Sequence, residues 1–352
     1  MIRVLMCGPD ATSGGVATHT KSLTAELKEL GVIITPHSFS GSNLKKLYQR
    51  TVGLFLNAIK KRTEYDIIHV QTSGGIFSFI SAITGAIVSS ILHKPLVVTF
   101  HHSETQKFVG DYKRAFRFVL DRSDKLILVS HKQKDAVISL FENVSAKIIV
   151  LPNGFKNSLY HAMDKKVCRE NLGLSNNKKV IFNISNLIES KGHNYLISAM
   201  RDVVSISNNC VCYIAGKGYF RRSLEDLVNE LQLQEHVKFL GWIPDEQIPI
   251  WMNACDIFVL PSLAEGNPTV MFEALGCGKP FVGTKVGGVP EIITSDQYGL
   301  LVEPADPEDL AEKILVALDR EWDQEAILAY AERYTWENIA KEIVGVYEQV
   351  LG

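Results

Sequence analysis

The residues best suited to chemistry stand where an apolar run, Ile257 to Leu260, gives way to a turn and a predicted helix. The turn is made of three residues that favour a helix start, Gly266, Asn267 and Pro268. The first N–H groups of the helix belong to Thr269 and Val270, and such groups have no carbonyl partner inside the helix. Because the positive end of the helix dipole lies behind them, we expect these N–H groups to bind an anion such as a phosphate.

Two carboxylates flank this helix start. Glu265 stands in the loop before the helix, and Glu273 lies about one turn inside it. Taken alone, either residue can be explained as a charge that stabilises a helix start. The whole run is more specific than either residue, because it brings two carboxylates and an anion site into one short segment.

Further residues that could bind a ligand follow apolar runs elsewhere in the chain. They are Lys191, the pair Gly14 and Gly15 with their backbone N–H groups, and the pair His101 and His102. Glycine permits backbone conformations that bring N–H groups close to an anion. The glycine pair forms neither a Gly-x-Gly-x-x-Gly fingerprint nor a P-loop, which argues against a dinucleotide oxidoreductase and an NTPase. Adjacent strand residues point to opposite faces, so the two histidines cannot easily chelate one metal ion. A lysine beside a glycine is by itself commonly a solvated side chain.

The elements that position these groups alternate along the first half of the chain. Apolar runs predict strands at residues 2–7, 66–70, 95–100, 125–129 and 147–150, separated by helix-length segments. This alternation predicts a parallel, doubly wound α/β sheet with ligands at the carboxyl ends of its strands. Residues 76–92 carry no charge but five Ser or Thr, and we predict a buried helix there rather than a membrane span.

A second series of strands follows an irregular stretch that ends near Asn177. We predict strands at residues 179–184, 210–215, 237–239, 257–260, 281–283 and 299–302. The sequence therefore divides into an N-terminal domain, 1–158, and a C-terminal domain, 159–335, with a last helix at 336–352 that packs back on the first. Two such sheets predict two Rossmann-like, doubly wound domains that face a cleft.

The sequence resembles the retaining GT-B glycosyltransferases of family 4. The resemblance covers nearly the full length and is carried by residues 261–280, 185–192 and 287–291. In this family the first Glu lies beside the transferred sugar and the second binds the ribose hydroxyls of a nucleotide, roles that fall on Glu265 and Glu273. Carboxylates suit such contacts, because their hydrogen bonds to hydroxyl groups are charge-assisted.

The resemblance implies roles for further residues. Glu265, His101 and Lys191 would be catalytic, with His101 facing the sugar and Lys191 stabilising the leaving diphosphate. Many relatives carry Arg where Asn186 stands, which leaves less positive charge here, and Trp242 has packing as its alternative role. The implied donor-binding residues are Gly14, Gly15, Asn186, Lys191, Gly216, Gly241, Trp242, Glu265, Gly266, Asn267, Pro268, Thr269, Val270 and Glu273.

The chain contains no Asp-x-Asp triplet, which GT-A enzymes use to hold a divalent metal on the donor diphosphate. The resemblance therefore implies a metal-independent hexosyltransferase with no cofactor and a nucleotide diphosphate sugar as co-substrate. The acceptor would be a hydroxyl group, on a lipid-linked glycan or a polysaccharide. Three alternatives stay open: a nucleotide-sugar epimerase, a phosphorylase of the same fold, and a non-catalytic nucleotide-sugar-binding subunit.

The charge distribution bears on partners. Lys and Arg number 37 against 39 Asp and Glu, which argues against a general nucleic-acid binder. Residues 1–158 are nevertheless basic, with 20 Lys and Arg against 11 Asp and Glu, and at 42–66 and 107–122 basic residues alternate with apolar ones. We predict that this surface touches an anionic membrane, with an ordinary solvated helix face as the alternative. Six scattered cysteines and no recognisable export signal predict a cytoplasmic protein, peripheral on the inner face of the membrane.

Overall fold

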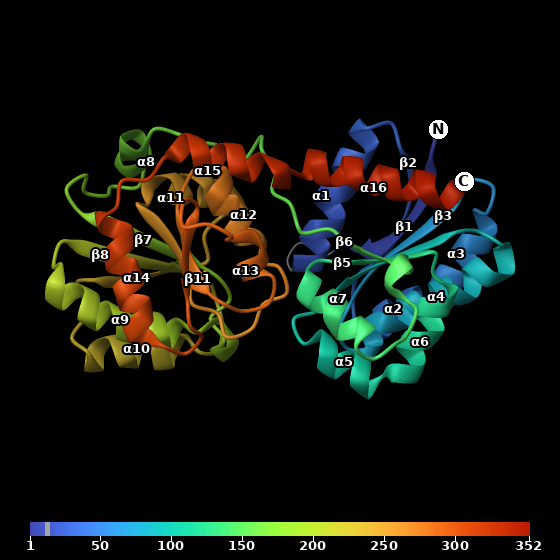
Figure 1. Ribbon diagram of the computed structural model, residues 1–352, viewed down its shortest axis with the longest axis horizontal. Coiled ribbons are helices and arrows are strands. Elements are labelled where there is room, and N and C mark those ends of the chain that lie inside the picture. Colours follow the sequence, from blue (N-terminus) through green and yellow to red (C-terminus); the bar gives the residue numbers. More distant parts are fainter. Residues whose placement is uncertain (11–14) are drawn as a thin grey trace. The chain divides into compact units, whose positions relative to one another are not determined.

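The computed structural model describes residues 1–10 and 15–352, which form two compact units (Figure 1). The first unit contains Met1–Gly154 and Trp336–Gly352, and the second contains Phe155–Thr335. The sequence placed this division near residue 158. It falls earlier because the backbone N–H of Phe155 donates to the Tyr334 carbonyl at 3.0 Å, and the Phe155 ring packs in the core of the second unit.

The sheet of the first unit is parallel throughout, in the order β2-β1-β3-β4-β5-β6. Its strands are β1 (Arg3–Pro9), β2 (Ile33–Phe39), β3 (Ile67–Ser73), β4 (Leu96–His101), β5 (Lys125–Leu128) and β6 (Ile148–Val150). The sequence analysis predicted all of these except β2. That strand contains Pro36, alternates exposed and buried positions, and lies at the sheet edge, where a proline is tolerated.

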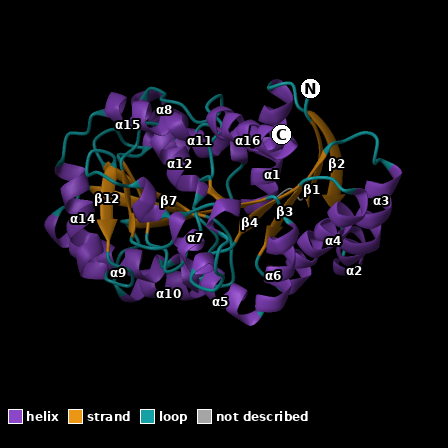
Figure 2. Ribbon diagram, turned by 45° about the vertical axis from the view of Figure 1, so that its right-hand side comes forward, coloured by secondary structure: helices purple, strands orange, loops and turns teal. Residues whose placement is uncertain are grey.

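Helices cover both faces of this sheet (Figure 2). They are α1 (Gly15–Glu29), α2 (Asn43–Tyr48), α3 (Leu54–Lys60), α4 (Ile76–Leu92), α5 (Thr105–Asp111), α6 (Lys113–Arg122), α7 (His131–Ile138) and α16 (Trp336–Leu351). Apolar residues of α1 and α16, among them Leu23, Ile343 and Tyr347, share one core cluster with Val4 and Val97 of the sheet. The last helix thus packs on the first unit, although it follows the second in the sequence.

The second unit repeats the architecture in the order β12-β11-β10-β7-β8-β9, again all parallel. Its strands are β7 (Lys179–Ile184), β8 (Cys210–Ala215), β9 (Val237–Gly241), β10 (Ile257–Leu260), β11 (Phe281–Thr284) and β12 (Gly299–Val302), as the sequence predicted to within two residues. Its helices are α8 (Lys165–Asn171), α9 (His193–Ile206), α10 (Arg221–Glu230), α11 (Ile248–Ala254), α12 (Thr269–Gly276), α13 (Val289–Ile292), α14 (Pro307–Asp319) and α15 (Gln324–Ala331).

Each sheet has one point where the strand order reverses. In the first unit this point lies between β1 and β3, and in the second between β7 and β10. Open α/β sheets bind ligands at the carboxyl ends of the two strands that flank such a point. The loops after β7 and β10 hold Lys191 and Glu265, so these predicted residues lie where the topology favours a ligand. The predicted cleft between the two domains stays a prediction.

The predicted helix at 76–92 is present as α4, which buries Phe79, Ala82, Ala86 and Val88 in the core of the first unit. Across residues 1–10 and 15–352, none of the helices combines the length and the apolar character needed to span a bilayer.

Candidate active site

Lys191 and Glu265, predicted from separate motifs, are in direct contact. The Lys191 ammonium donates to Oε1 of Glu265 at 2.6 Å, and the Ser262 hydroxyl donates to the same oxygen at 2.6 Å. The Glu265 side chain is only 9% exposed, whereas that of Lys191 is 21% exposed. The carboxylate is therefore held by two donors, while the ammonium keeps access to solvent or to a ligand.

Glycines allow the loops around this pair to pack backbone against backbone. Gly192 has φ +66°, and a Cβ there would lie 1.9 Å from the Pro261 carbonyl oxygen. Gly287, after β11, has φ +55°, and a Cβ there would lie 2.0 Å from the Glu265 carbonyl oxygen. A larger residue at either position would push the loops apart, so the closeness of these loops depends on glycine.

The start of α12 has the form that the sequence predicted. Pro268 precedes the first helical residue, Thr269, and Gly266 and Asn267 form the turn after Glu265. Asn267 is buried, whereas Thr269 and Val270 are partly exposed. Since the first N–H groups of a helix lack carbonyl partners within it, this end of α12 can accept an anion.

Glu273 lies on α12, mostly buried, and its neighbour is a residue that the sequence analysis missed. The Tyr160 hydroxyl donates a hydrogen bond to the Glu273 carboxylate. Burial, with a smaller contribution from Asp245, nevertheless raises the pKa of Glu273 to about 7 against the lowering effect of this bond. Tyr160 stands in the irregular stretch before α8, where nothing in the sequence pattern singles it out.

The predicted turns at Gly216 and Gly241 meet behind the segment that holds Lys191. The Gly216 N–H donates to the Gly241 carbonyl at 2.7 Å, and a Cβ on Gly216 would lie 1.9 Å from the Ser185 carbonyl oxygen. Trp242 is 59% exposed, so the packing interpretation of this residue is wrong. The Lys217 ammonium lies 5.4 Å from the centre of the Trp242 ring, and Asn186 is exposed beside this turn.

In the first unit, His101 and His102 point in different directions. His101 Nε2 lies 3.0 Å from the amide oxygen of Gln71, and its ring meets the His19 ring edge to face at 4.4 Å between centroids. The ring of His102 lies against Gly74, where a Cβ would come within 2.2 Å of its Nδ1. Gly15 begins α1, and Gly14 lies outside the described residues.

Burial keeps the histidines around His101 neutral. It lowers the pKa of His19 to about 4 and that of His69 to about 3. A positive charge on one of these rings would also repel a positive charge on the next, which disfavours protonation of both. The pKa of His101 is held well below its usual range by burial and by His19 and His69. These three rings therefore act as hydrogen-bonding groups rather than as cations near neutral pH.

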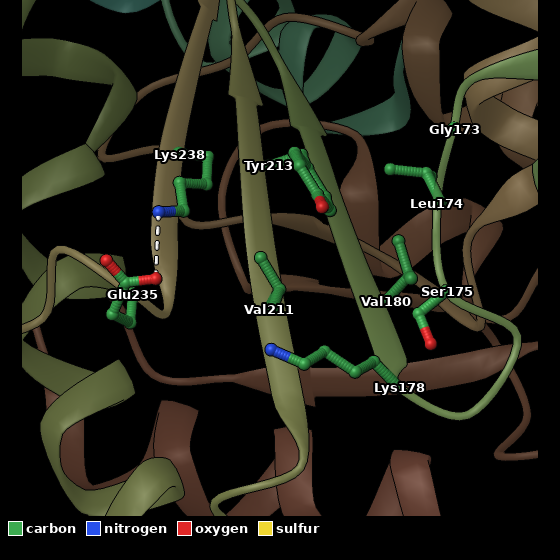
Figure 3. A pocket seen from close by; sticks show the side chains of 9 residues that line it. All are labelled: Gly173, Leu174, Ser175, Lys178, Val180, Val211, Tyr213, Glu235 and Lys238. Carbon is green, nitrogen blue, oxygen red and sulfur yellow. Dashed lines mark hydrogen bonds and ion pairs between the residues drawn. The ribbon is translucent and has the colours of Figure 1, made fainter.

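A separate cavity of about 190 Å³ lies at the opposite edge of the second sheet (Figure 3). Lys178, Val180, Val211 and Lys238 line it near the beginnings of β7, β8 and β9, and Lys238 pairs with Glu235 at 3.4 Å. It contains none of the predicted site residues, which follow the ends of these strands.

The chain is similar to known proteins over most of its length. A family described as Glycosyltransferase Family 4 matches residues 13–158, and one described as Glycosyl transferases group 1 matches residues 164–334. An uncharacterized glycosyltransferase of Methanocaldococcus jannaschii is 30% identical over 301 residues, 81% of this chain and 75% of that protein. A 2-deoxystreptamine N-acetyl-D-glucosaminyltransferase of Niallia circulans is 25% identical over 74% of this chain and 70% of that protein. The crystal structure of HepE from Anabaena in complex with UDP has a TM-score of 0.82 at 23% identity, covering 99% of this chain and all of that one.

Proposed function

The chain belongs to the glycosyltransferases of family 4 and group 1, and from this premise we propose that it moves a sugar from a nucleotide diphosphate sugar to a hydroxyl group with retention of configuration. The observation that carries the proposal is the contact between Lys191 and Glu265 beside the start of α12. The carboxyl ends of β7 and β10 thus bring together a cation, a carboxylate and helix N–H groups. These groups suit a substrate that presents both phosphates and hydroxyls.

The donor would be bound by groups with distinct tasks. Lys191 and the N–H groups of Thr269 and Val270 would bind the diphosphate, and Glu273, held by Tyr160, would accept hydrogen bonds from the ribose hydroxyls. Gly241 and Trp242 would meet the base. Lys191 has three N–H donors, so it can contact a phosphate oxygen and keep its bond to Glu265. Asn186, Gly15 and the other predicted donor contacts rest on the resemblance alone.

The chemical step would use charge that is already in position. When the bond between the sugar and the diphosphate breaks, negative charge develops on the leaving oxygen, and Lys191 and the helix start stabilise it there. Glu265, fixed by Ser262 and Lys191, would lie beside the sugar as positive charge grows on its ring. The leaving phosphate oxygen would then take the proton of the attacking hydroxyl on the same face. No protein base, metal or cofactor is assigned a task in this scheme.

A donor screen followed by product analysis tests this proposal. Isothermal calorimetry with UDP-, GDP- and ADP-glucose should show binding of one donor, and UDP-glucose is the first to try because the Anabaena protein has been crystallised with it. The bound donor is then incubated with an acceptor panel, and NMR of the product gives the anomeric configuration. Transfer with inversion would contradict the retaining mechanism.

The alternative activities give different results in the same assay. Conversion of the donor sugar without an acceptor would point to an epimerase, and a requirement for inorganic phosphate to a phosphorylase. Tight donor binding with neither transfer nor hydrolysis across the panel would point to a binding subunit. Each of these outcomes would overturn the proposed reaction.

We further propose that the acceptor is linked to a lipid and that the first unit meets it at an anionic membrane. The helices α2 and α3 are joined by the π-helical turn Gln49–Gly53, and four apolar side chains recur every four residues along this stretch. They are Leu44, Tyr48, Val52 and Leu56, which are 82%, 53%, 50% and 54% exposed. Exposed apolar residues with lysines and arginines around them are typical of helices that lie on anionic bilayers.

Vesicle co-sedimentation tests the membrane proposal. The protein should sediment with vesicles that contain anionic lipid at low salt, and Leu44→Glu with Leu56→Glu should abolish sedimentation. Ile206→Glu is the matched control, because Ile206 is an apolar residue of the second unit that is 74% exposed. Sedimentation that survives the double substitution, or is absent in the unaltered protein, would contradict the proposal.

A further inference from the structure

A chain of hydrogen bonds leads from His101 into the interior of the first unit. His101 Nε2 lies 3.0 Å from Oε1 of Gln71, and Nε2 of Gln71 lies 3.1 Å from Nε2 of His69. Nδ1 of His69 then lies 2.6 Å from the hydroxyl oxygen of Tyr347 on α16. Gln71, His69 and Tyr347 are at most 1% exposed, so water has almost no access to these bonds.

With the Gln71 amide oriented as in the structure, the chemistry of the groups gives each bond a direction. An amide oxygen only accepts, so Nε2 of His101 must carry the proton that is donated to Gln71. The amide nitrogen of Gln71 only donates, so Nε2 of His69 must accept, and Nδ1–H of His69 donates to Tyr347. One consistent set of proton positions thus runs from β4 through β3 to α16.

Neighbouring groups hold the same arrangement. The Thr99 hydroxyl lies 2.8 Å from Nε2 of His69, on the side where Gln71 approaches. The His19 ring packs edge to face on His101, while Nδ1 of His19 lies 2.9 Å from the amide oxygen of Asn153. His19 must therefore donate to Asn153, and it does not compete for the Gln71 amide.

We propose that Gln71 is a positioning residue, held by His69 and Tyr347, that keeps His101 in the tautomer with the proton on Nε2 and a free electron pair on Nδ1. Resting on the proposed function, the inference adds that Nδ1 of His101 accepts a hydrogen bond from a hydroxyl of the transferred sugar. Whether Nδ1 of His101 accepts or donates a hydrogen bond is then set by the tertiary contact with Tyr347 on α16, and not by the residues next to His101 in the sequence.

The tautomer can be observed directly. In protein labelled with ¹⁵N-histidine, a long-range ¹H–¹⁵N spectrum should show His101 with a protonated Nε2 and an unprotonated Nδ1, and His101→Gln assigns the signals. The Nε2 proton should exchange slowly because it is hydrogen-bonded and shielded from water. A proton on Nδ1 of His101 in the unaltered protein would overturn the proposal.

Two substitutions separate positioning from packing. Gln71→Leu removes both hydrogen bonds, so the slow Nε2 proton should disappear and a second population with Nδ1 protonated should arise. Gln71→Glu still accepts from Nε2–H, so it should keep the tautomer, and its negative charge should raise the pKa of His101 relative to the unaltered protein. The titratable groups that face His101 in this cluster are His19 and His69, with Tyr347 beyond, and their signals are followed in the same titration.

Gln133→Leu is the matched control. Gln133 is also a buried glutamine of the first unit, but its amide nitrogen donates to the carbonyl of His102 at 2.7 Å. The His101 signals should be unchanged in this variant. If Gln133→Leu alters them as Gln71→Leu does, or if Gln71→Leu leaves them unaltered, positioning by Gln71 is rejected.

Kinetics then test the link to the sugar. We expect Gln71→Leu to lower kcat/KM for transfer by about 10–100-fold, similar to losses seen when partners that orient metal-bound histidines are removed, with substantial rescue in Gln71→Glu. A tautomer that changes while kcat/KM does not would overturn the assigned sugar contact. The spectra are independent of catalysis, so absence of any transferase activity would contradict the proposed function and leave the positioning result standing.

Discussion

Each unit carries predicted site residues at the carboxyl ends of its own sheet, but the polar groups around these residues differ in charge. In the second unit, a lysine and a glutamate form a pair that is partly open to solvent, beside a helix start. In the first unit, three histidines stand in a buried network of neutral hydrogen bonds. Of these two groups, the charged one thus lies in the unit proposed to bind the diphosphate, and the neutral one lies in the other unit.

The difference extends to the response to protons. Burial lowers the pKa of His19 and His69 but raises that of Glu273, because it disfavours whichever form is charged. The second unit also contains a buried histidine, His193, whose pKa burial lowers to about 4. Protonation of Glu273 should offset the cost of protonating this histidine, so we expect the second unit to lose less stability in acid than the first. This contrast leads to four testable expectations.

Removal of the cation from the second unit should have the largest effect. Lys191→Ala should reduce kcat/KM by about 10²–10³-fold, as loss of one preorganised donor to a developing charge does. Lys285→Ala is the matched control, because Lys285 also pairs with a glutamate of this unit but both side chains are well exposed. Steady-state kinetics and thermal unfolding of both variants decide the matter. Equal activity of the two variants would remove Lys191 from the proposed mechanism.

Acid should destabilise the first unit before the second. The unfolded chain takes up protons at His19 and His69 near pH 6.5, whereas the folded pKa values are about 4 and about 3. From pH 7 to 5.5 we expect each histidine to cost the first unit about 1 kcal/mol, while in the second unit Glu273, with a folded pKa of about 7, offsets the similar cost of His193, whose folded pKa is about 4.

Hydrogen exchange of peptides from β3 and β4 against β7 and β10, corrected for intrinsic rates, measures this difference. His69→Gln cannot titrate, so it should remove about 1 kcal/mol of the acid loss of the first unit, while the losses at His19 and His101 persist. An acid-induced increase in opening that is larger in the second unit than in the first would contradict the contrast between the units.

Donor affinity should depend on the protonation of Glu273. Since only the carboxylate accepts from both ribose hydroxyls, affinity should fall as the pH drops below about 7, the folded pKa of this group. Glu273→Gln should bind about 10-fold more weakly at pH 8 and lose this dependence. Tyr160→Phe removes a bond that lowers the pKa, so its midpoint should move to higher pH. Calorimetry across pH measures the donor affinity of the unaltered protein and of these two variants, with Tyr219→Phe as the control at an exposed tyrosine. The same dependence of affinity on pH in all four proteins would refute a role for Glu273 protonation.

The exposed ring of Trp242 should contribute least. Trp242→Ala removes a surface that Lys217 already covers in part, and we expect the donor affinity to fall by about 2–5-fold, with little change in Tm. Thermal shift and calorimetry measure the two quantities. A drop in Tm of several degrees with unaltered affinity would identify Trp242 as a structural residue instead.

Short apolar runs and turn residues were sufficient to predict most of the strands and the start of α12. Eleven strands were predicted because each is a short apolar run bounded by turn residues, and α12 because Gly266 to Pro268 mark its start. The strand β2 was missed, since Pro36 and exposed side chains interrupt its apolar pattern at the sheet edge. A hydrophobic pattern reports burial, and the alternation of exposed and buried positions along β2 leaves no continuous apolar run to recognise.

Contacts between distant residues were beyond the sequence. Tyr160 stands more than a hundred residues before Glu273, and His69 is separated from Tyr347 by most of the chain. Neither tyrosine belongs to a motif, so only the packing of the irregular stretch on α12, and of α16 on the first sheet, assigns them a partner.

Hydrophobic periodicity and turn chemistry act over a few residues, so the amino-acid pattern specifies which elements form and which residues stand at their ends. The folded arrangement specifies which of those ends meet and in what protonation state. It placed the Lys191 ammonium on the Glu265 carboxylate and made the histidines around His101 neutral, because hydrogen bonding and loss of solvation depend on neighbours that folding brings together from distant parts of the chain.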